Sequence, residues 1–203
     1  SFLTDDKGIT VPNPRFFVNA QKKLARLQRV LSRRKRGSKN REKARLKVAR
    51  QHLKVFNQRT DFLHKLSSTI TKKYGFVVVE DLNIKGMVKS NLAKSIHDAS
   101  WYRFIQMLSY KAVTGGGELI KNSKTRGSSK RCSSCGIVNE MPLKKRKFKC
   151  VCGFVAHRDH NAARNMLKDT VGLAEITLVE TLPLPSIIGK ASEVVEAGTT
   201  FDG

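Results

Sequence analysis

Cys132-Ser-Ser-Cys135-Gly, followed after a basic loop by Cys150-Val-Cys152-Gly, contains every cysteine of the 203-residue chain. Four thiolates arranged in two close pairs suit the tetrahedral geometry of a structural zinc ion. The glycine after each pair allows the backbone to turn tightly around a metal. The stretch therefore predicts a zinc ribbon in which Cys132, Cys135, Cys150 and Cys152 are the ligands.

The alternatives to a zinc site are that the cysteines form two disulfides or are four free buried thiols. The chain has no apolar signal segment, so an oxidising compartment is not indicated and zinc is favoured. The second pair is C-x-C, which is shorter than the usual C-x-x-C and crowds the third and fourth ligands. His157 is an alternative ligand for one of these positions, although an all-cysteine site is favoured.

The charge balance of the chain narrows its class. Lys and Arg number 40 against 16 Asp and Glu, which gives a formal net charge of +24. A chain this basic is expected to bind a polyanion, and nucleic acid is the default. No apolar run is long enough to cross a membrane, so no membrane partner is expected. A ribosomal-type protein, or merely solvated lysine-rich helix faces, would explain the charge as well.

The first half of the chain predicts a hairpin and two helices. Residues 1–11, with a turn at 5–8, have the pattern of a β-hairpin. Helices are predicted over 17–31 and from about 40 to 73, because apolar residues recur there at helical spacing. They form a basic antiparallel pair whose outward cations either contact phosphate or are only solvated. The expected core stripe of the second helix is Ala44, Val48, Val55, Phe62, Leu66 and Ile70.

The second half predicts an α/β arrangement. The β-branched run at 76–81 predicts a central strand covered on both faces, followed by a loop around 86–91. A helix from about residue 98 is ended by the glycines at 115–117, and a strand is expected at 118–120. A last helix is predicted over 161–168, and residues 171–203 are expected to form a poorly ordered tail.

Two carboxylates stand out by their positions. Glu80 ends the apolar strand, and Asp159 comes just before the last predicted helix, where the helix dipole favours negative charge. Alternatively, Glu80 and Asp81 are a solvated strand end and Asp159 is a helix N-cap. In so basic a chain, the two acids together suggest a Mg²⁺ site for phosphodiester chemistry, since hard divalent ions prefer carboxylate oxygens.

Four segments in this order resemble the TnpB-type family of transposon-encoded, RNA-guided DNA endonucleases, also called OrfB or probable transposases. The segment Val77-Val-Val-Glu-Asp-Leu-Asn-Ile-Lys-Gly-Met87 resembles their second acidic motif, and residues 101–112 resemble the helix that follows it. Residues 128–136 resemble the entry to their zinc ribbon, and Arg158-Asp-His-Asn-Ala-Ala-Arg-Asn165 resembles their third acidic motif.

The resemblance implies an α/β fold with an RNase H-like (RuvC-like) core, a helical-hairpin insertion and a zinc ribbon. The core would comprise residues 1–123 and 159–170, with the insertion at 17–74. The ribbon would comprise residues 124–158, and the tail 171–203. The family's first acid lies on the opening strand of this fold, and Asp5 and Asp6 do not match it. The core is therefore expected to be incomplete at its N-terminus.

By the same resemblance, Glu80 and Asp159 would be catalytic acids that bind Mg²⁺, and the cysteines would bind Zn²⁺. The implied partners are DNA and a guide RNA, in the prokaryotic cytoplasm at the nucleoid. Because the first acid is missing, these residues are expected to cleave DNA weakly or not at all. The alternatives are a nuclease-dead remnant that binds nucleic acid, and a non-catalytic zinc-ribbon protein of the ribosome or transcription machinery.

Overall fold

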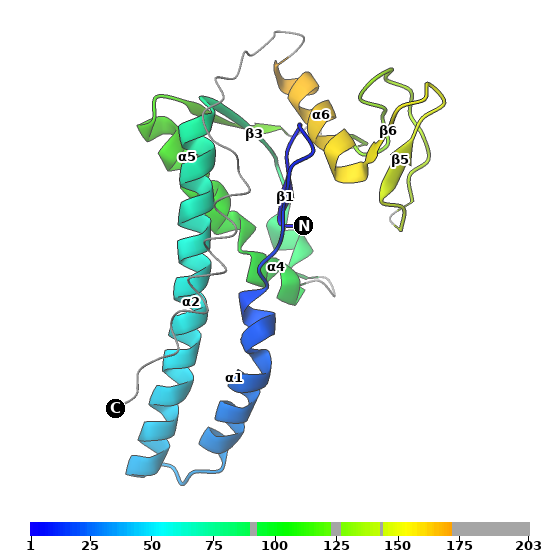
Figure 1. Ribbon diagram of the computed structural model, residues 1–203. Coiled ribbons are helices and arrows are strands. Elements are labelled where there is room, and N and C mark those ends of the chain that lie inside the picture. Colours follow the sequence, from blue (N-terminus) through cyan, green and yellow to red (C-terminus); the bar gives the residue numbers. More distant parts are fainter. Residues whose placement is uncertain (90–92, 123–126, 143, 172–203) are drawn as a thin grey trace. The chain divides into compact units, whose positions relative to one another are not determined.

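The structure is a computed structural model that describes residues 1–89, 93–122, 127–142 and 144–171. It divides into two compact units, and both are visible in Figure 1. Unit 1 contains residues 1–13, 68–83 and the described residues from 108 onward, and unit 2 contains residues 14–67 and 84–107. The tail expected at 171–203 lies outside the described residues, apart from Val171 at the end of the last helix. Among the described helices, none has the length and apolarity that a membrane crossing needs.

Unit 1 begins with the predicted hairpin. Strand β1 (Leu3–Thr4) pairs antiparallel with β2 (Thr10–Val11), and Leu3 lies opposite Val11. The turn between them is closed by Asp5, whose Oδ1 accepts hydrogen bonds from the backbone N–H groups of Lys7 (3.1 Å) and Ile9 (2.7 Å). Burial raises the pKa of this carboxyl group above its ordinary value. The side chain of Asp5 therefore has a structural role in the turn.

Two parallel strands form the sheet that carries the first predicted acid. β3 (Phe76–Glu80) pairs with β4 (Glu118–Asn122), and Glu80 lies opposite Asn122. The pairing starts where the N–H of Glu118 donates to the carbonyl of Gly75 (2.8 Å). Gly117 has to be glycine, because a Cβ there would collide with that carbonyl.

The expectation that residues 76–81 are covered on both faces is wrong for this structure. Within the described residues β3 has one neighbouring strand, Phe76 is 52% exposed, and the three valines are only half-buried. The run of β-branched residues reported strand propensity correctly. Strand propensity does not show which elements will pair beside the strand and cover its two faces, and those elements decide the burial.

The last helix of unit 1, α6 (Arg158–Val171), packs against β3, β4 and β1 as well as against β5 (Lys147–Lys149) and β6 (Val155–His157). It starts at Arg158, three positions before the predicted start, because β6 leads directly into it. Asp159 consequently lies inside the first helical turn and not in front of the helix.

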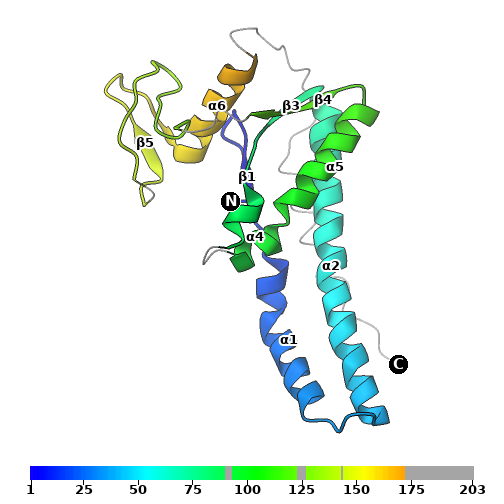
Figure 2. The same cartoon turned by 180° about the vertical axis from the view of Figure 1, so that it is seen from behind.

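Unit 2 contains the predicted helical pair, except for residues 68–73 at the end of the second helix, which belong to unit 1. Helix α1 (Phe16–Ser32) and helix α2 (Lys39–Lys73) run antiparallel and side by side in Figures 1 and 2. Phe16 meets Phe62 edge to face at 6.1 Å between ring centroids. Leu24 of α1 and Ala44 and Val55 of α2 are buried. Leu63, which was not part of the expected stripe, is fully buried, whereas Phe62 is only half-buried.

The remaining helices are α3 (Ile84–Met87) and α4 (Ala93–Ala99), which belong to unit 2, and α5 (Trp101–Thr114), which belongs to unit 2 up to Met107 and to unit 1 from Leu108 onward. The short helix α3 replaces part of the loop that was expected around 86–91. The single helix expected from about residue 98 is divided, because Ser100 has a positive φ of 54° between α4 and α5. The glycines at 115–117 end α5 as predicted.

An aspartate of α4 holds the start of α1. The N-cap residue Arg15 makes no side-chain cap, and Asp98 supplies the acceptors in its place. Its Oδ1 accepts from the N–H of Phe17 (2.9 Å) and from Nη2 of Arg59 (2.9 Å), and its Oδ2 accepts from the N–H of Val18 (3.3 Å). The Asp98 side chain is only 2% exposed, so one buried carboxylate joins α1, α2 and α4.

Candidate functional site

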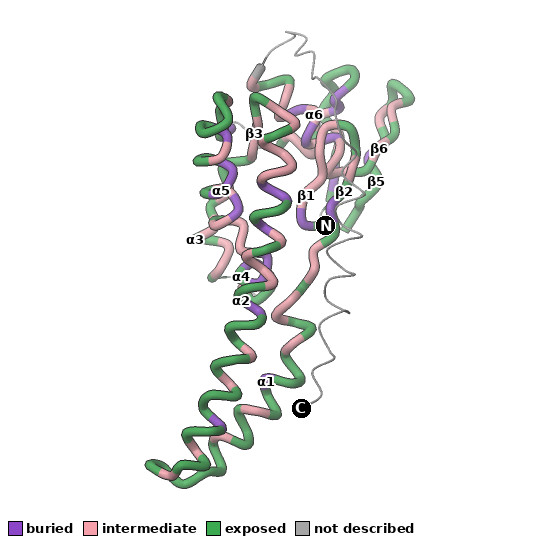
Figure 3. Tube along the Cα trace, turned by 60° about the vertical axis from the view of Figure 1, so that its left-hand side comes forward, coloured by how far each residue is buried: buried purple, intermediate pink, exposed green. Residues whose placement is uncertain are grey.

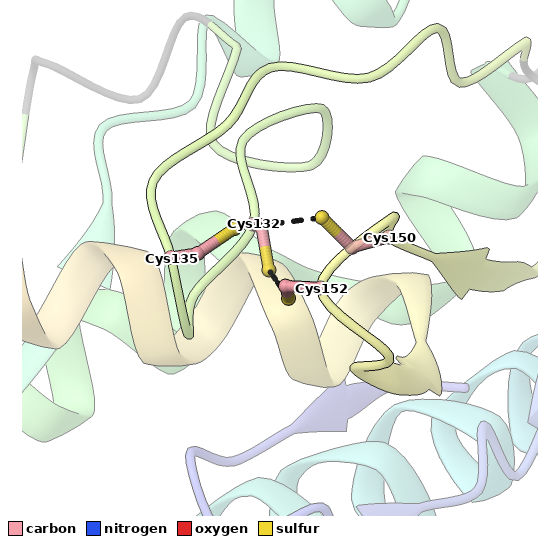
Figure 4. Close-up of side chains that lie close together, drawn as sticks. All are labelled: Cys132, Cys135, Cys150 and Cys152. Atoms are coloured by element: carbon pink, nitrogen blue, oxygen red, sulfur yellow. Dashed lines mark hydrogen bonds between the residues drawn. The ribbon is translucent and has the colours of Figure 1, made fainter.

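The four cysteines come together at the tips of two backbone turns in unit 1. Figure 4 shows Cys132 facing Cys152 and Cys135 facing Cys150. The corresponding Sγ–Sγ distances are 3.8 Å and 3.5 Å, and all four sulfurs lie within 4.8 Å of one another. Gly136 (φ 82°) and Gly153 (φ 88°) have the left-handed backbone that lets each turn close.

This arrangement fits a tetrahedral metal ion and excludes disulfides. Sulfurs at about 2.3 Å from one zinc ion stand about 3.8 Å apart, which is close to the separations found. A disulfide would need about 2.05 Å, so the cysteines are free thiols. Amide groups already point at two of the sulfurs, since Ser134 N–H lies 3.4 Å from Cys132 Sγ and Asn139 Nδ2 lies 3.5 Å from Cys150 Sγ. Four close cysteines that can hold a metal are therefore present.

The thiols influence one another strongly. The backbone N–H of Cys152, followed by the Asn139 amide and the adjacent thiols, lowers the pKa of Cys150 to about 6. For Cys135 the backbone N–H of Ile137 favours the thiolate, but desolvation and the three other thiols outweigh it and raise the pKa to about 12. Cys150 is thus disposed to ionise before Cys135, and a cation bound by the cluster would replace the remaining thiol protons.

His157 is not part of this cluster. It ends β6, and its Nδ1 accepts a hydrogen bond from the N–H of Asp159 (3.3 Å) and lies 3.8 Å from Asp159 Oδ2. The group of potential metal ligands found among the described residues consists of the four cysteines. The geometry therefore favours the all-cysteine site over the alternative with histidine.

Two buried asparagines of α6 bind the backbone of the first cysteine turn. Asn161 accepts from the N–H of Ser133 (2.9 Å) and donates to the carbonyl of Arg131 (2.7 Å). One turn later, Asn165 donates to the carbonyls of Arg131 (2.6 Å) and Ser128 (2.7 Å). Lys168 donates to the carbonyl of Ser133 (2.6 Å). The hydrogen bonds of Asn161, Asn165 and Lys168 to the backbone of this turn are called the amide ladder below. They attach the cysteine turn to α6, the helix that carries Asp159.

Replacing Asn161 with alanine is expected to loosen this attachment. The change leaves the Ser133 N–H without its acceptor in a buried place, which costs about 1–3 kcal/mol. Since 1.4 kcal/mol corresponds to about a tenfold change in an equilibrium constant, zinc affinity should fall by roughly tenfold or more. Competition with a chromophoric chelator measures this. Ser134→Ala, an exposed change in the same turn, is the control and should leave the affinity unchanged.

The predicted acids lie on elements that contact each other. Glu80 is the exposed last residue of β3, and Asp159 is a half-buried residue of the first turn of α6. Asn122, opposite Glu80, donates from Nδ2 to Thr170 Oγ1 (2.8 Å) and to the Met166 carbonyl (3.3 Å) on α6. Asp159 precedes Thr170 by three helical turns, so it lies on the same face of α6, about 16 Å nearer the start of the helix.

The start of α6 is held against the hairpin turn. The ring of His160 packs on Gly8, and its Nε2 lies 2.9 Å from the carbonyl oxygen of Asp6. The backbone next to Asp159 is therefore held in two ways. His160 attaches it to the β1–β2 turn, and Asn161 attaches it to the cysteine turn. Roles for Asn122, Asn161 and Asn165 were not predicted from the sequence. The spacing of Asn161 and Asn165, four apart in a helix, was an available signal, whereas Asn122 offered none.

Comparisons with known proteins agree with the motifs. A family model described as "Probable transposase" matches residues 1–91, and one described as "Cas12f1-like, TNB domain" matches residues 101–166. A Streptomyces pristinaespiralis protein named as an RNA-guided DNA endonuclease is 43% identical over 176 residues, which is 86% of this chain and 43% of the relative. The similarly named InsQ of Escherichia coli K12 is 38% identical over 74% of this chain and 42% of its own length.

More distant relatives extend the same group. The TnpB-like protein L79 of Acanthamoeba polyphaga mimivirus is 29% identical over 76% of this chain and 31% of its own length. Among solved structures, a Cas12f1–sgRNA–target DNA complex matches 78% of this chain and 43% of its own chain, with a TM-score of 0.55 at 21% identity. The mixed helix–strand fold is therefore similar to that of Cas12f1. The chain spans less than half the length of these relatives.

Proposed function

Because this chain belongs to the TnpB-type family of probable transposases, we propose that it is the nuclease part of an RNA-guided DNA endonuclease. The proposal is supported by the family motifs that contain the two acids and by the packing of β3, which ends in Glu80, against α6, which carries Asp159 in its first turn. The hydrogen bonds of Asn122, the partner of Glu80, reach Met166 and Thr170, about three turns beyond Asp159, so the approach of the two carboxylates is part of the proposal. In this proposal the RNase H-like core comprises residues 1–123 and 159–170, the helical insertion 17–74 and the zinc ribbon 124–158.

Each acid has a defined task in the proposed site. Glu80 and Asp159 would bind Mg²⁺ through their carboxylates, and the N-terminal N–H groups of α6 favour negative charge at Asp159. When bound, Mg²⁺ would activate water and stabilise the leaving oxygen of the phosphodiester. The strong positive charge of the chain attracts DNA and guide RNA. Two carboxylates rarely hold two ions, so the 203 residues alone are expected to cleave weakly.

The proposed metal binding can be tested without cleavage. Titration with Mn²⁺, followed by electron paramagnetic resonance, should detect a site that Glu80→Gln and Asp159→Asn each weaken by roughly tenfold or more, since each removes an anionic ligand. Glu118→Gln is the matched control, because Glu118 is an exposed acid at the opposite end of the same two strands. An equal loss in all three variants, or none in the first two, would rule out the acidic site.

Cleavage separates the proposed nuclease from a protein that only binds nucleic acid. With Mg²⁺ and a DNA substrate, any cutting by the purified chain should disappear in Glu80→Gln while DNA binding persists. Cutting that survives both Glu80→Gln and Asp159→Asn would belong to a contaminant, and the proposed catalytic roles would be wrong.

A further inference from the structure

One side of the cysteine cluster is open to solvent. Cys135 and Cys152 are exposed, Cys150 is half-buried and Cys132 is only 1% exposed, so each pair contributes one exposed cysteine. The glycine after each pair adds no side chain that could cover the sulfurs. Figure 3 shows that the chain around β5 and β6 is largely exposed. A small molecule in solution can therefore approach the cluster from this side.

The core of the ribbon protects the opposite side of the cluster. Cys132, Met141 and Phe148 are its buried residues, and Cys150 and Phe154 pack at its edge. Neither of the two exposed cysteines belongs to this core. Because the susceptibility of a cysteine to oxidation follows its access to solvent as well as its thiolate character, oxidation is expected to begin at an exposed cysteine.

With zinc bound, exposure and not acidity distinguishes the four sulfurs. A cysteine that binds a metal is deprotonated, so all four sulfurs are thiolates in the loaded cluster. The thiolate is the form of cysteine that attacks an oxidant. The order in which the empty cluster ionises therefore does not decide which sulfur reacts, and the exposed positions are favoured.

Cys135 has the more favourable partner of the two exposed cysteines. Its Sγ lies 3.5 Å from Cys150 Sγ, whereas Cys152 Sγ lies 3.8 Å from Cys132 Sγ. Figure 4 shows that both of these contacts join one cysteine turn to the other. Cys150 lies at the edge of the core, so its side chain can move with less loss of packing than the enclosed Cys132. A disulfide is therefore favoured between Cys135 and Cys150.

We propose that Cys135 is a site of oxidation by hydrogen peroxide and that Cys150 is its resolving partner. The Cys135 thiolate attacks one peroxide oxygen, the O–O bond breaks, and the products are a sulfenic acid and hydroxide. The Cys150 thiolate then attacks the Cys135 sulfur, which forms the S–S bond and releases a second hydroxide. The peroxide gains the two electrons that the two thiolates lose, and a dithiol reductant reverses the reaction.

The disulfide removes two of the four ligands of the zinc site. The thiolate is the form of cysteine that binds a metal, and neither sulfur of a disulfide is a thiolate. The two cysteines that remain cannot complete the four-coordinate geometry of structural zinc, so the ion leaves. This inference rests on the zinc site within the proposed function, and it needs neither the acids nor a nucleic acid.

The test uses two histidine variants of the reduced, zinc-loaded chain. Cys135→His and Cys152→His each keep three cysteines and one histidine, a ligand set that structural zinc accepts. Cys135→His removes the proposed oxidation site. Cys152→His is the matched control, because it changes the other exposed cysteine and keeps Cys135 and Cys150. Metal analysis before the addition of peroxide shows that each variant holds zinc.

Hydrogen peroxide is then added, and a chromophoric chelator reports the zinc released relative to samples without peroxide. The wild type and Cys152→His should release zinc at similar rates, and Cys135→His should be about tenfold slower or more, because it lacks the reactive thiolate. Peptide mass spectrometry of the oxidised wild type, with free thiols blocked, should identify a cross-link between Cys135 and Cys150. Dithiothreitol with added zinc should restore the loaded chain.

Three results would overturn the inference: equal rates in all three proteins, a cross-link that joins Cys132 to Cys152 in place of the expected one, or oxidised Cys135 with zinc retained. The mass spectrometry needs no variant, so it decides the question even when a histidine variant does not bind zinc. Reduced wild type without zinc would show that the zinc site is wrong, and the inference with it. Zinc that is bound but resists peroxide contradicts the oxidation site alone.

Discussion

Extraction of the proposed zinc ion is expected to unfold the described residues between Gly127 and His157 while the helices of unit 2 stay intact. The core beneath the cysteine turns is small, since it consists of Cys132, Met141 and Phe148 with Cys150 and Phe154 packed at its edge. Binding of structural zinc supplies about 10–16 kcal/mol in small metal domains. No comparable apolar burial is available here to replace it.

Hydrogen exchange measured by mass spectrometry shows the loss directly. Peptides from the ribbon should lose protection after chelator treatment, and peptides from α1 and α2 should not. Cys132→Ser should reproduce the loss, because it removes a ligand that is also buried, whereas Ser134→Ala should not. Reduced, purified protein that contains no zinc, or a ribbon that keeps its protection without metal, would contradict the expectation.

Replacing Asp98 with alanine should destabilise unit 2 by about 3–5 kcal/mol, because it leaves Arg59 as a largely buried charge without its carboxylate. The same change removes the acceptors of the Phe17 and Val18 N–H groups at the start of α1. Urea unfolding can be followed by the fluorescence of Trp101, the single tryptophan, which lies in unit 2. Hydrogen exchange in the first turn of α1 reports the lost cap.

A matched change separates this effect from the mere loss of an acid. Asp61→Ala breaks an exposed ion pair with Lys65 on α2 and should cost less than about 1 kcal/mol. Asn at position 98 retains one acceptor oxygen, so it should fall between the wild type and alanine. A double-mutant cycle with Arg59→Ala gives the coupling energy of the pair. Equal effects of Asp98→Ala and Asp61→Ala would contradict the role assigned to the buried carboxylate.

The features that the sequence predicted well are those decided by near neighbours. Apolar spacing located α1 and α2, and the spacing of the cysteine pairs located the cluster, because both patterns extend over a few residues. The cap of α1 could not be predicted in this way, since Asp98 lies 81 positions from Phe17 and 39 from Arg59. The burial of β3 was misjudged because it depends on distant elements that pair beside the strand and cover its faces. The roles of Glu80 and Asp159 remain predictions.

The amide ladder has a consequence for the cysteine turn that it supports. The hydrogen bonds of Asn161 and Asn165 go to carbonyls and to one N–H of this turn, so these bonds do not depend on which side chains the turn carries. Exposed side chains of this turn, such as that of Ser134, can then be exchanged without loss of these hydrogen bonds, provided that the main chain at positions 128–133 keeps its path. Such an exchange would change what the turn presents to solvent and leave its attachment to α6 in place.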